Sequence, residues 1–276
     1  MKWSLSLGKI AGIKVQVHWT FLILIGWVVL SQSYSGASAV ATLWVLLFVF
    51  ALFACVTLHE LGHALMARRY HFETRDITLL PIGGLARPEG VPDEPPLELA
   101  LAAAGPLVNV VIAGLLFLFL SLSGAMPEAM ALSEVKPGNF LYLLMQVNVL
   151  LVVFNLIPAF PMDGGRIFRA LLAMRYPRAT ATRIAATAGQ MLAILFVFAG
   201  LFYNPFLVLI GIFVYLGAQS EAEFEQSRSL LHGHMVRDIL MQRFFRLRPD
   251  QPIADAVAIL LDSQARDFLI MEAETV

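Results

Sequence analysis

The sequence is short of charged residues. Of its 276 residues, 14% are charged and 59% are hydrophobic, whereas a soluble domain carries about 25% charged residues. The composition excludes an ordinary soluble domain and predicts a polytopic membrane protein in contact with the lipid bilayer. A net charge of −1 gives no indication of a nucleic-acid partner.

Cysteine is almost absent. The single thiol, Cys55, cannot form an internal disulfide, which excludes a disulfide scaffold. It lies one helical turn before His59, so a role as a metal ligand or redox group stays open beside a plain packing role.

Long apolar runs make up most of the chain. A membrane-spanning helix needs about 20 mostly apolar residues. Six segments come near this length, at residues 15–31, 40–67, 97–122, 139–158, 184–203 and 205–220. We therefore expect an all-α polytopic membrane protein with about six transmembrane helices over residues 1–222, followed by a linker at 223–231.

Basic residues lie almost entirely on one side of these helices. With the N-terminus inside, twelve Lys and Arg residues fall in the inner segments and only Lys136 falls outside. Because short cytosolic loops are enriched in Lys and Arg, we expect a multi-pass protein of the cell membrane with both termini in the cytosol.

Residues 76–96 do not fit a simple helix. They combine a short alternating run, the pair Gly83 and Gly84, and several prolines. Such a segment can form a re-entrant β-hairpin if its backbone is buried in protein or lines a watery cavity. An ordinary cytosolic loop is the alternative that the residues leave open.

The stretch HELGH at residues 59–63 carries the clearest chemical signal. His59 and His63 are four residues apart, so on a helix they share one face. Two imidazoles in this arrangement can bind one Zn²⁺, and Glu60 can act on water beside it. The alternative is a histidine pair at the membrane interface.

A third metal ligand is expected far along the chain. Asp163 lies in NLIPAFPMDGGR, which closes the fourth apolar segment on the same side as HELGH. Pro158 and Pro161 interrupt a helix there, and a carboxylate in such a turn suits a metal site. A solvated Asp163 paired with Arg166 is the alternative.

Three stretches together resemble a known family. HELGH at 59–63, GPLVN at 105–109 and NLIPAFPMDGG at 155–165 are similar, in order and spacing, to the site-2 proteases, which are intramembrane zinc metalloproteases. The resemblance covers roughly residues 10–220. It implies one zinc ion held by His59, His63 and Asp163, with Glu60 as the general base.

The same resemblance implies residues that bind substrate. Asn109 and Asn155 match asparagines of the family and are expected near the substrate or oxyanion, although a helix-packing hydrogen bond is an alternative for Asn109. The segment that carries Gly83 and Gly84 is expected to hold the substrate as an added strand.

The implied substrates are transmembrane proteins, such as membrane-tethered transcription or sigma factors. The sequence leaves the oligomeric state of the chain open. Two alternative functions stay open. One is a divalent-metal transporter regulated by a CBS module, and the other is a proteolytically inactive membrane chaperone.

The C-terminal segment has a soluble composition. Residues 232–276 resemble the start of a CBS domain, with a first helix, a short strand, a helix that opens at PDQPIADAV and a second strand. The segment is shorter than a complete repeat. Binding of an adenine nucleotide is therefore expected only where a complete CBS pair is present.

Overall fold

A computed structural model describes residues 4–81, 83–88, 94–126, 135–231, 245–263 and 268–271. The chain divides into two compact units, Met1–Ser227 and Arg228–Val276. The first unit contains the apolar helices, and the second contains the soluble C-terminal segment.

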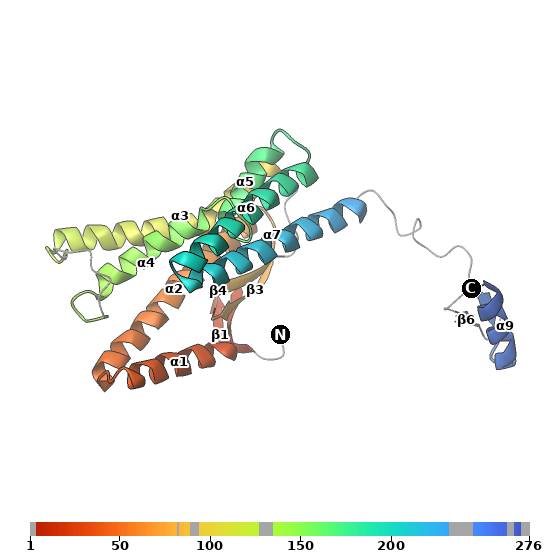
Figure 1. The fold of residues 1–276 in the computed structure, drawn as a ribbon, viewed down its shortest axis with the longest axis horizontal. Coiled ribbons are helices and arrows are strands. Elements are labelled where there is room, and N and C mark those ends of the chain that lie inside the picture. Colours follow the sequence, from red (N-terminus) through yellow and green to blue (C-terminus); the bar gives the residue numbers. More distant parts are fainter. Residues whose placement is uncertain are drawn as a thin grey trace. The chain divides into compact units, whose positions relative to one another are not determined.

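Seven helices make up most of the first unit (Figure 1): α1 Thr20–Tyr34, α2 Ala39–Arg69, α3 Pro95–Leu122, α4 Phe140–Asn155, α5 Asp163–Ala173, α6 Arg178–Phe202 and α7 Pro205–Leu231. Among the described residues, α2, α3, α6 and α7 are long and apolar enough to cross a membrane. The helices α1 and α4 are apolar but shorter, with 15 and 16 residues. At 1.5 Å per residue they extend about 22–24 Å, less than the roughly 30 Å hydrocarbon core. The chain is thus a membrane protein with four candidate spans, and six spans are not confirmed.

The helices expose large apolar side chains. Leu122 of α3, Phe202 of α6 and Leu209 of α7 are 81%, 80% and 62% exposed. Contiguous apolar surface of this kind is unfavourable in water and is expected to face lipid.

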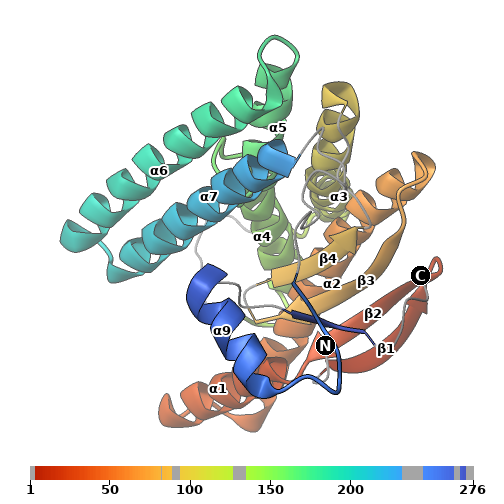
Figure 2. The same cartoon turned by 90° about the vertical axis from the view of Figure 1, so that its right-hand side faces the viewer.

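The fold is mostly helical, as expected, but a four-stranded sheet accompanies the helices and is larger than the single hairpin expected (Figure 2). Its strands are β1 Ser4–Ile10, β2 Ile13–His18, β3 Thr74–Leu80 and β4 Gly83–Pro88, in the order β1-β2-β3-β4. The pairs β1–β2 and β3–β4 are antiparallel, and β2–β3 is parallel. The hairpin expected after residue 76 is present as β3–β4. The first helix begins at Thr20 and not at residue 15, because IKVQVH alternates apolar and polar residues and pairs as a strand.

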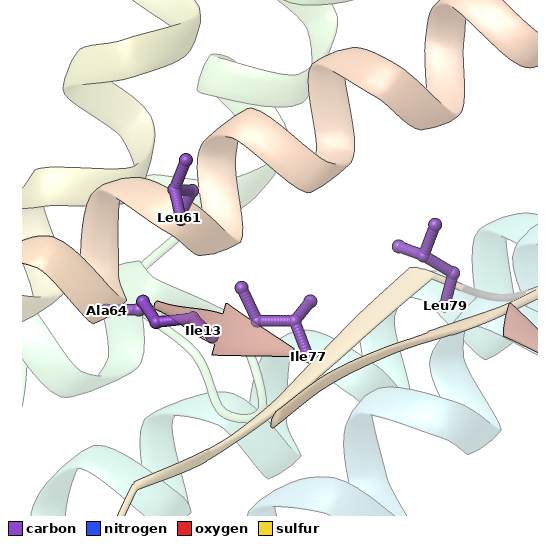
Figure 3. Close-up of a cluster of buried hydrophobic side chains, with 5 residues drawn as sticks. All are labelled: Ile13, Leu61, Ala64, Ile77 and Leu79. Atoms are coloured by element: carbon purple, nitrogen blue, oxygen red, sulfur yellow. The ribbon is translucent and has the colours of Figure 1, made fainter. Parts of the chain in front are cut away.

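One face of the sheet packs against α2. Ile13 of β2 and Ile77 and Leu79 of β3 form a buried cluster with Leu61 and Ala64 of α2 (Figure 3). The alternation of side chains along a strand places these residues on the same face. The cluster fixes the sheet against the turn of α2 that carries HELGH.

Helices α2 and α3 approach each other closely at small residues. A Cβ added to Gly62 would lie 2.7 Å from Val108 Cγ2 and 2.9 Å from the carbonyl oxygen of Ala104. Small residues at a helix interface let two backbones approach in this way. The contact brings GPLVN of α3 beside HELGH of α2.

The second unit contains β5 Phe245–Leu247, α9 Ile253–Ser263 and β6 Phe268–Ile270, with β5 and β6 parallel. The strand, helix and strand expected from the sequence are present. Most of the helix expected before them lies outside the described residues, and the CBS assignment stays a prediction. Residues 223–231, expected as a linker, are the end of α7, because AEFEQSRSLL contains no helix-breaking Gly or Pro.

Candidate metal centre

Three side chains from two distant segments converge on one point. His59 and His63 lie one turn apart on α2, and Asp163 is the first residue of α5. The Oδ2 atom of Asp163 is 3.1 Å from Nε2 of each histidine, and the two Nε2 atoms are 3.2 Å apart. This is the group of potential metal ligands found among the described residues.

The other ring nitrogen of each histidine is also engaged. Nδ1 of His59 is 2.6 Å from Oδ1 of Asn109, and Nδ1 of His63 is 2.8 Å from the carbonyl oxygen of Leu101. Both oxygens are acceptors, so each Nδ1 carries the proton and each Nε2 presents a lone pair. Hydrogen bonds of this kind orient histidines that bind a metal.

The donor set fits a zinc ion. Two imidazole lone pairs and a carboxylate oxygen face one another at 3.1–3.2 Å, which is repulsive unless a cation lies between them. In a tetrahedral site with bonds of about 2.0–2.1 Å, neighbouring donors lie about 3.3–3.4 Å apart. The observed spacing therefore suits a small tetrahedral ion, and three protein donors leave one position for water or substrate.

Tight backbone turns present Asp163. The loop before α5 contains Ala159, Phe160 and Met162, all of which are at most 4% exposed. A Cβ on Gly165 would lie 2.6 Å from the carbonyl carbon of Ala159, and one on Gly164 would overlap Ile157. The two glycines let α5 start directly against this loop, which places Asp163 beside α2.

Glu60 lies between the two histidines in sequence, and β4 passes beside it. A Cβ on Gly84 would overlap Cγ of Glu60 and lie 3.1 Å from its Oε1. Gly83 has a φ of +140°, a conformation that favours glycine. Both glycines predicted to bind substrate thus lie on β4, and Gly84 contacts the predicted general base.

The two predicted asparagines lie in different surroundings. Asn109 is fully buried, and its amide donates to Oδ1 of Asn148 at 2.8 Å while it accepts from His59. Asn155 donates to the carbonyl of Leu151 within α4 at 3.0 Å. Asn109 therefore orients a metal ligand, and the substrate-binding role of each asparagine stays a prediction.

Cys55 is separate from the group of metal donors. It is buried, and its sulfur accepts a hydrogen bond from Nδ2 of Asn148 at 3.4 Å. This contact supports the packing role.

Two supporting groups were missed in the sequence. Asn148 extends the chain of hydrogen bonds from His59 and donates to the carbonyl of Leu144 at 2.8 Å. An asparagine in the middle of an apolar helix was the available signal for it, since polar residues in such helices face partners. The carbonyl of Leu101 carried no signal, because every residue has one.

Known proteins share these features. Residues 47–136 and 125–199 match Peptidase family M50. A zinc metalloprotease from Methanocaldococcus jannaschii is 35% identical over 275 residues, covering 99% of this chain and 76% of that protein. A putative zinc metalloprotease from Mycobacterium tuberculosis is 32% identical over 259 residues, covering 87% of this chain and 64% of that protein.

A solved structure is also similar. The site-2 protease from Methanocaldococcus jannaschii matches with a TM-score of 0.57 and 37% identity, covering 80% of this chain and 95% of the other. These relatives are named as proteases, which favours that interpretation over the transporter alternative.

Proposed function

Since this chain belongs to peptidase family M50 and is a zinc metalloprotease, we propose that it hydrolyses peptide bonds within or near the transmembrane segments of other proteins. The observation that carries the proposal is the convergence of His59, His63 and Asp163 at the end of an apolar helix. Histidine and acidic side chains are costly at such a position unless they serve a site.

Glu60 is the general base of the proposed reaction. Bound zinc would be held by Nε2 of the two histidines and Oδ2 of Asp163, and it supplies a water of lowered pKa and a polarised carbonyl. Glu60 adjoins His59 on α2, which supports a role for its carboxylate in taking the proton of the attacking water. It then returns this proton to the leaving amine nitrogen.

Substrate is proposed to bind as an extended strand along β4. Among the described strands, β4 is at one edge of the sheet, and its Gly84 contacts Glu60. A helical substrate is internally hydrogen-bonded and must unwind before a peptide carbonyl can be attacked. An edge strand replaces the lost backbone hydrogen bonds by strand addition.

The proposed substrates are transmembrane proteins such as membrane-tethered transcription or sigma factors. The bias of Lys and Arg supports an orientation with both termini in the cytosol. The metal centre lies near the basic end of α2, which carries Arg68 and Arg69, so cleavage is expected toward the cytosolic side of the bilayer.

Two variants test the site. Replacing Glu60 by Gln keeps the shape but removes the base, so we expect about one zinc per chain and a loss of cleavage of at least about 100-fold. Replacing Asp163 by Ala removes one of three ligands, so zinc should be lost together with activity. Metal analysis of the purified protein and cleavage of a reconstituted transmembrane substrate measure both effects.

Exposed acidic residues supply the controls. Glu223 and Asp250 are exposed, so Glu223→Gln and Asp250→Ala should leave zinc and cleavage unchanged. An active Glu60→Gln enzyme would refute the role of Glu60, and full zinc in the Asp163→Ala protein would place the third ligand elsewhere.

A further inference from the structure

A network of buried charges lies behind the metal centre, and the proposed reaction does not use it. It joins α3, α5, α6 and α7 through Glu98, Arg169, Arg178, Glu221 and Glu225. Glu98, Arg169 and Glu225 are only 4%, 3% and 5% exposed. Buried charge is costly even when paired, so a stabilising role alone accounts poorly for this network.

The two arginines connect the helices. Nε of Arg169 donates to Oε1 of Glu98 at 2.7 Å, and its Nη1 donates to Glu221 at 2.5 Å. Nη1 of Arg178 donates to Oε2 of Glu98 at 2.7 Å, and its Nε donates to Glu225 at 3.1 Å. Burial by itself would lower the pKa of Arg169, but the carboxylates of Glu98 and Glu221 outweigh it and raise the pKa.

The network reaches the metal ligands by two routes. The guanidinium of Arg169 lies over the ring of Phe160 at 5.1 Å, and Phe160 belongs to the loop that presents Asp163. Glu98 precedes Leu101 by about one turn of α3, and the carbonyl of Leu101 orients His63. The same charges therefore fix the backbone on both sides of the site.

Helix α7 packs directly against the loop that precedes Asp163. A Cβ on Gly217 would lie 2.6 Å from Cδ of Pro161. Gly217, Glu221 and Glu225 are spaced by four residues, so they lie along one face of α7. The two glutamates that bind the arginines thus extend the face that supports the loop.

We propose that Glu221 and Glu225 are positioning residues of the metal centre. Through Arg169 and Arg178 they hold α7 against the loop before α5, and this contact sets the position of Asp163 relative to the two histidines. The proposal rests on the zinc site and is independent of the substrate.

The test removes both negative charges with little change of shape. The Glu221→Gln, Glu225→Gln double variant should bind zinc about tenfold more weakly in a chelator competition, as expected for groups that orient ligands. The visible spectrum of its Co²⁺ form should also differ from that of the wild type, because Asp163 is displaced. The kcat of the zinc enzyme should fall while KM stays unchanged.

Glu223→Gln is the matched control, since Glu223 lies on the same helix but is exposed and accepts a hydrogen bond from the neighbouring Gln219. It should keep the zinc affinity and the Co²⁺ spectrum of the wild type. A wild-type zinc affinity together with a wild-type Co²⁺ spectrum in the double variant would overturn the proposal. So would a lower melting temperature with an unchanged Co²⁺ spectrum, which indicates a purely structural role.

If the double variant does not fold, Arg169→Lys provides the second measurement. Lysine keeps the charge but cannot contact Glu98 and Glu221 with one planar fork. We expect weaker zinc binding and an altered Co²⁺ spectrum, and wild-type values would again overturn the proposal. The zinc affinity and the Co²⁺ spectrum need no substrate, so these two measurements can fail or succeed separately from the proposed proteolysis.

Discussion

At the scale of single residues, Gly105 sets the space around the metal donors. A Cβ at this position of α3 would overlap Nε2 of His63 and lie 2.7 Å from Nε2 of His59. In a Gly105→Ala protein the histidines must move apart or α3 must shift. We expect zinc affinity to fall about 100-fold or more, since the donors can no longer converge. Metal content after dialysis against a chelator measures this loss.

Gly114 provides the control for this change. It lies on the same helix with nothing within 4 Å of an added Cβ. Gly114→Ala should retain zinc, and helix stability should rise slightly because Ala restricts the unfolded chain. Full zinc binding by Gly105→Ala would contradict the close approach of α3 to the histidines.

Sequence reasoning located the candidate metal ligands better than the residues that support them. His59, Glu60 and His63 form a local pattern, and Asp163 was found because a proline-rich turn carried a carboxylate on the same side. The structure brings the three metal donors together, although 100 residues separate His63 from Asp163. The charged network was missed, because pairing among Glu98, Arg169 and Arg178 depends on how four helices pack.

At the scale of elements, the contact between β4 and α2 links the strand proposed to bind substrate to Glu60, the proposed general base. Gly84 of β4 has no room for a side chain beside Glu60. Replacing Gly84 by Val should push Glu60 aside while zinc stays bound. Because a displacement of about 1 Å can cost about 100-fold in rate, we expect cleavage to fall by about that factor. Cleavage rate and zinc content measured on one sample separate the two effects.

Gly26 of α1 has nothing within 4 Å of an added Cβ, so Gly26→Ala is the control and should cleave normally. A fully active Gly84→Val enzyme would show that β4 does not constrain Glu60.

Among the elements that sequence reasoning misplaced, β2 has a distant partner as well as a local one. Residues 40–67 and 97–122 were located well, because a long apolar run determines a helix by itself. The strand Ile13–His18 was taken as the start of a helix, since its valines raise hydropathy and its partner β3 lies about 60 residues away. Alternation of apolar and polar residues was the signal that should have received more weight.

At the scale of the whole molecule, α7 belongs to the membrane unit as far as Ser227. Glu225 lies beyond residue 222, where the membrane domain was expected to end, and it pairs with Arg178. A chain that ends after Leu231 should keep zinc and the melting temperature of the full chain. A chain that ends after Ala222 loses this pair, at a cost of about 1–3 kcal/mol. The melting temperature should then fall by several degrees.

Thermal unfolding of both shortened proteins in the same detergent checks this prediction. Equal melting temperatures for the two would contradict a contribution of Glu225. Unfolding of the longer one at low temperature would show that the two compact units depend on each other.

The parallel pairing of β2 with β3 has a consequence for how the protein is made. These strands flank α1 and α2, so β2 leaves the ribosome well before its neighbour exists. The chain must run out along α1 and back along α2 before the two strands can meet. The sheet then closes over the turn of α2 that carries His59 and His63. Closure of the sheet over the candidate zinc site therefore depends on completion of both α1 and α2.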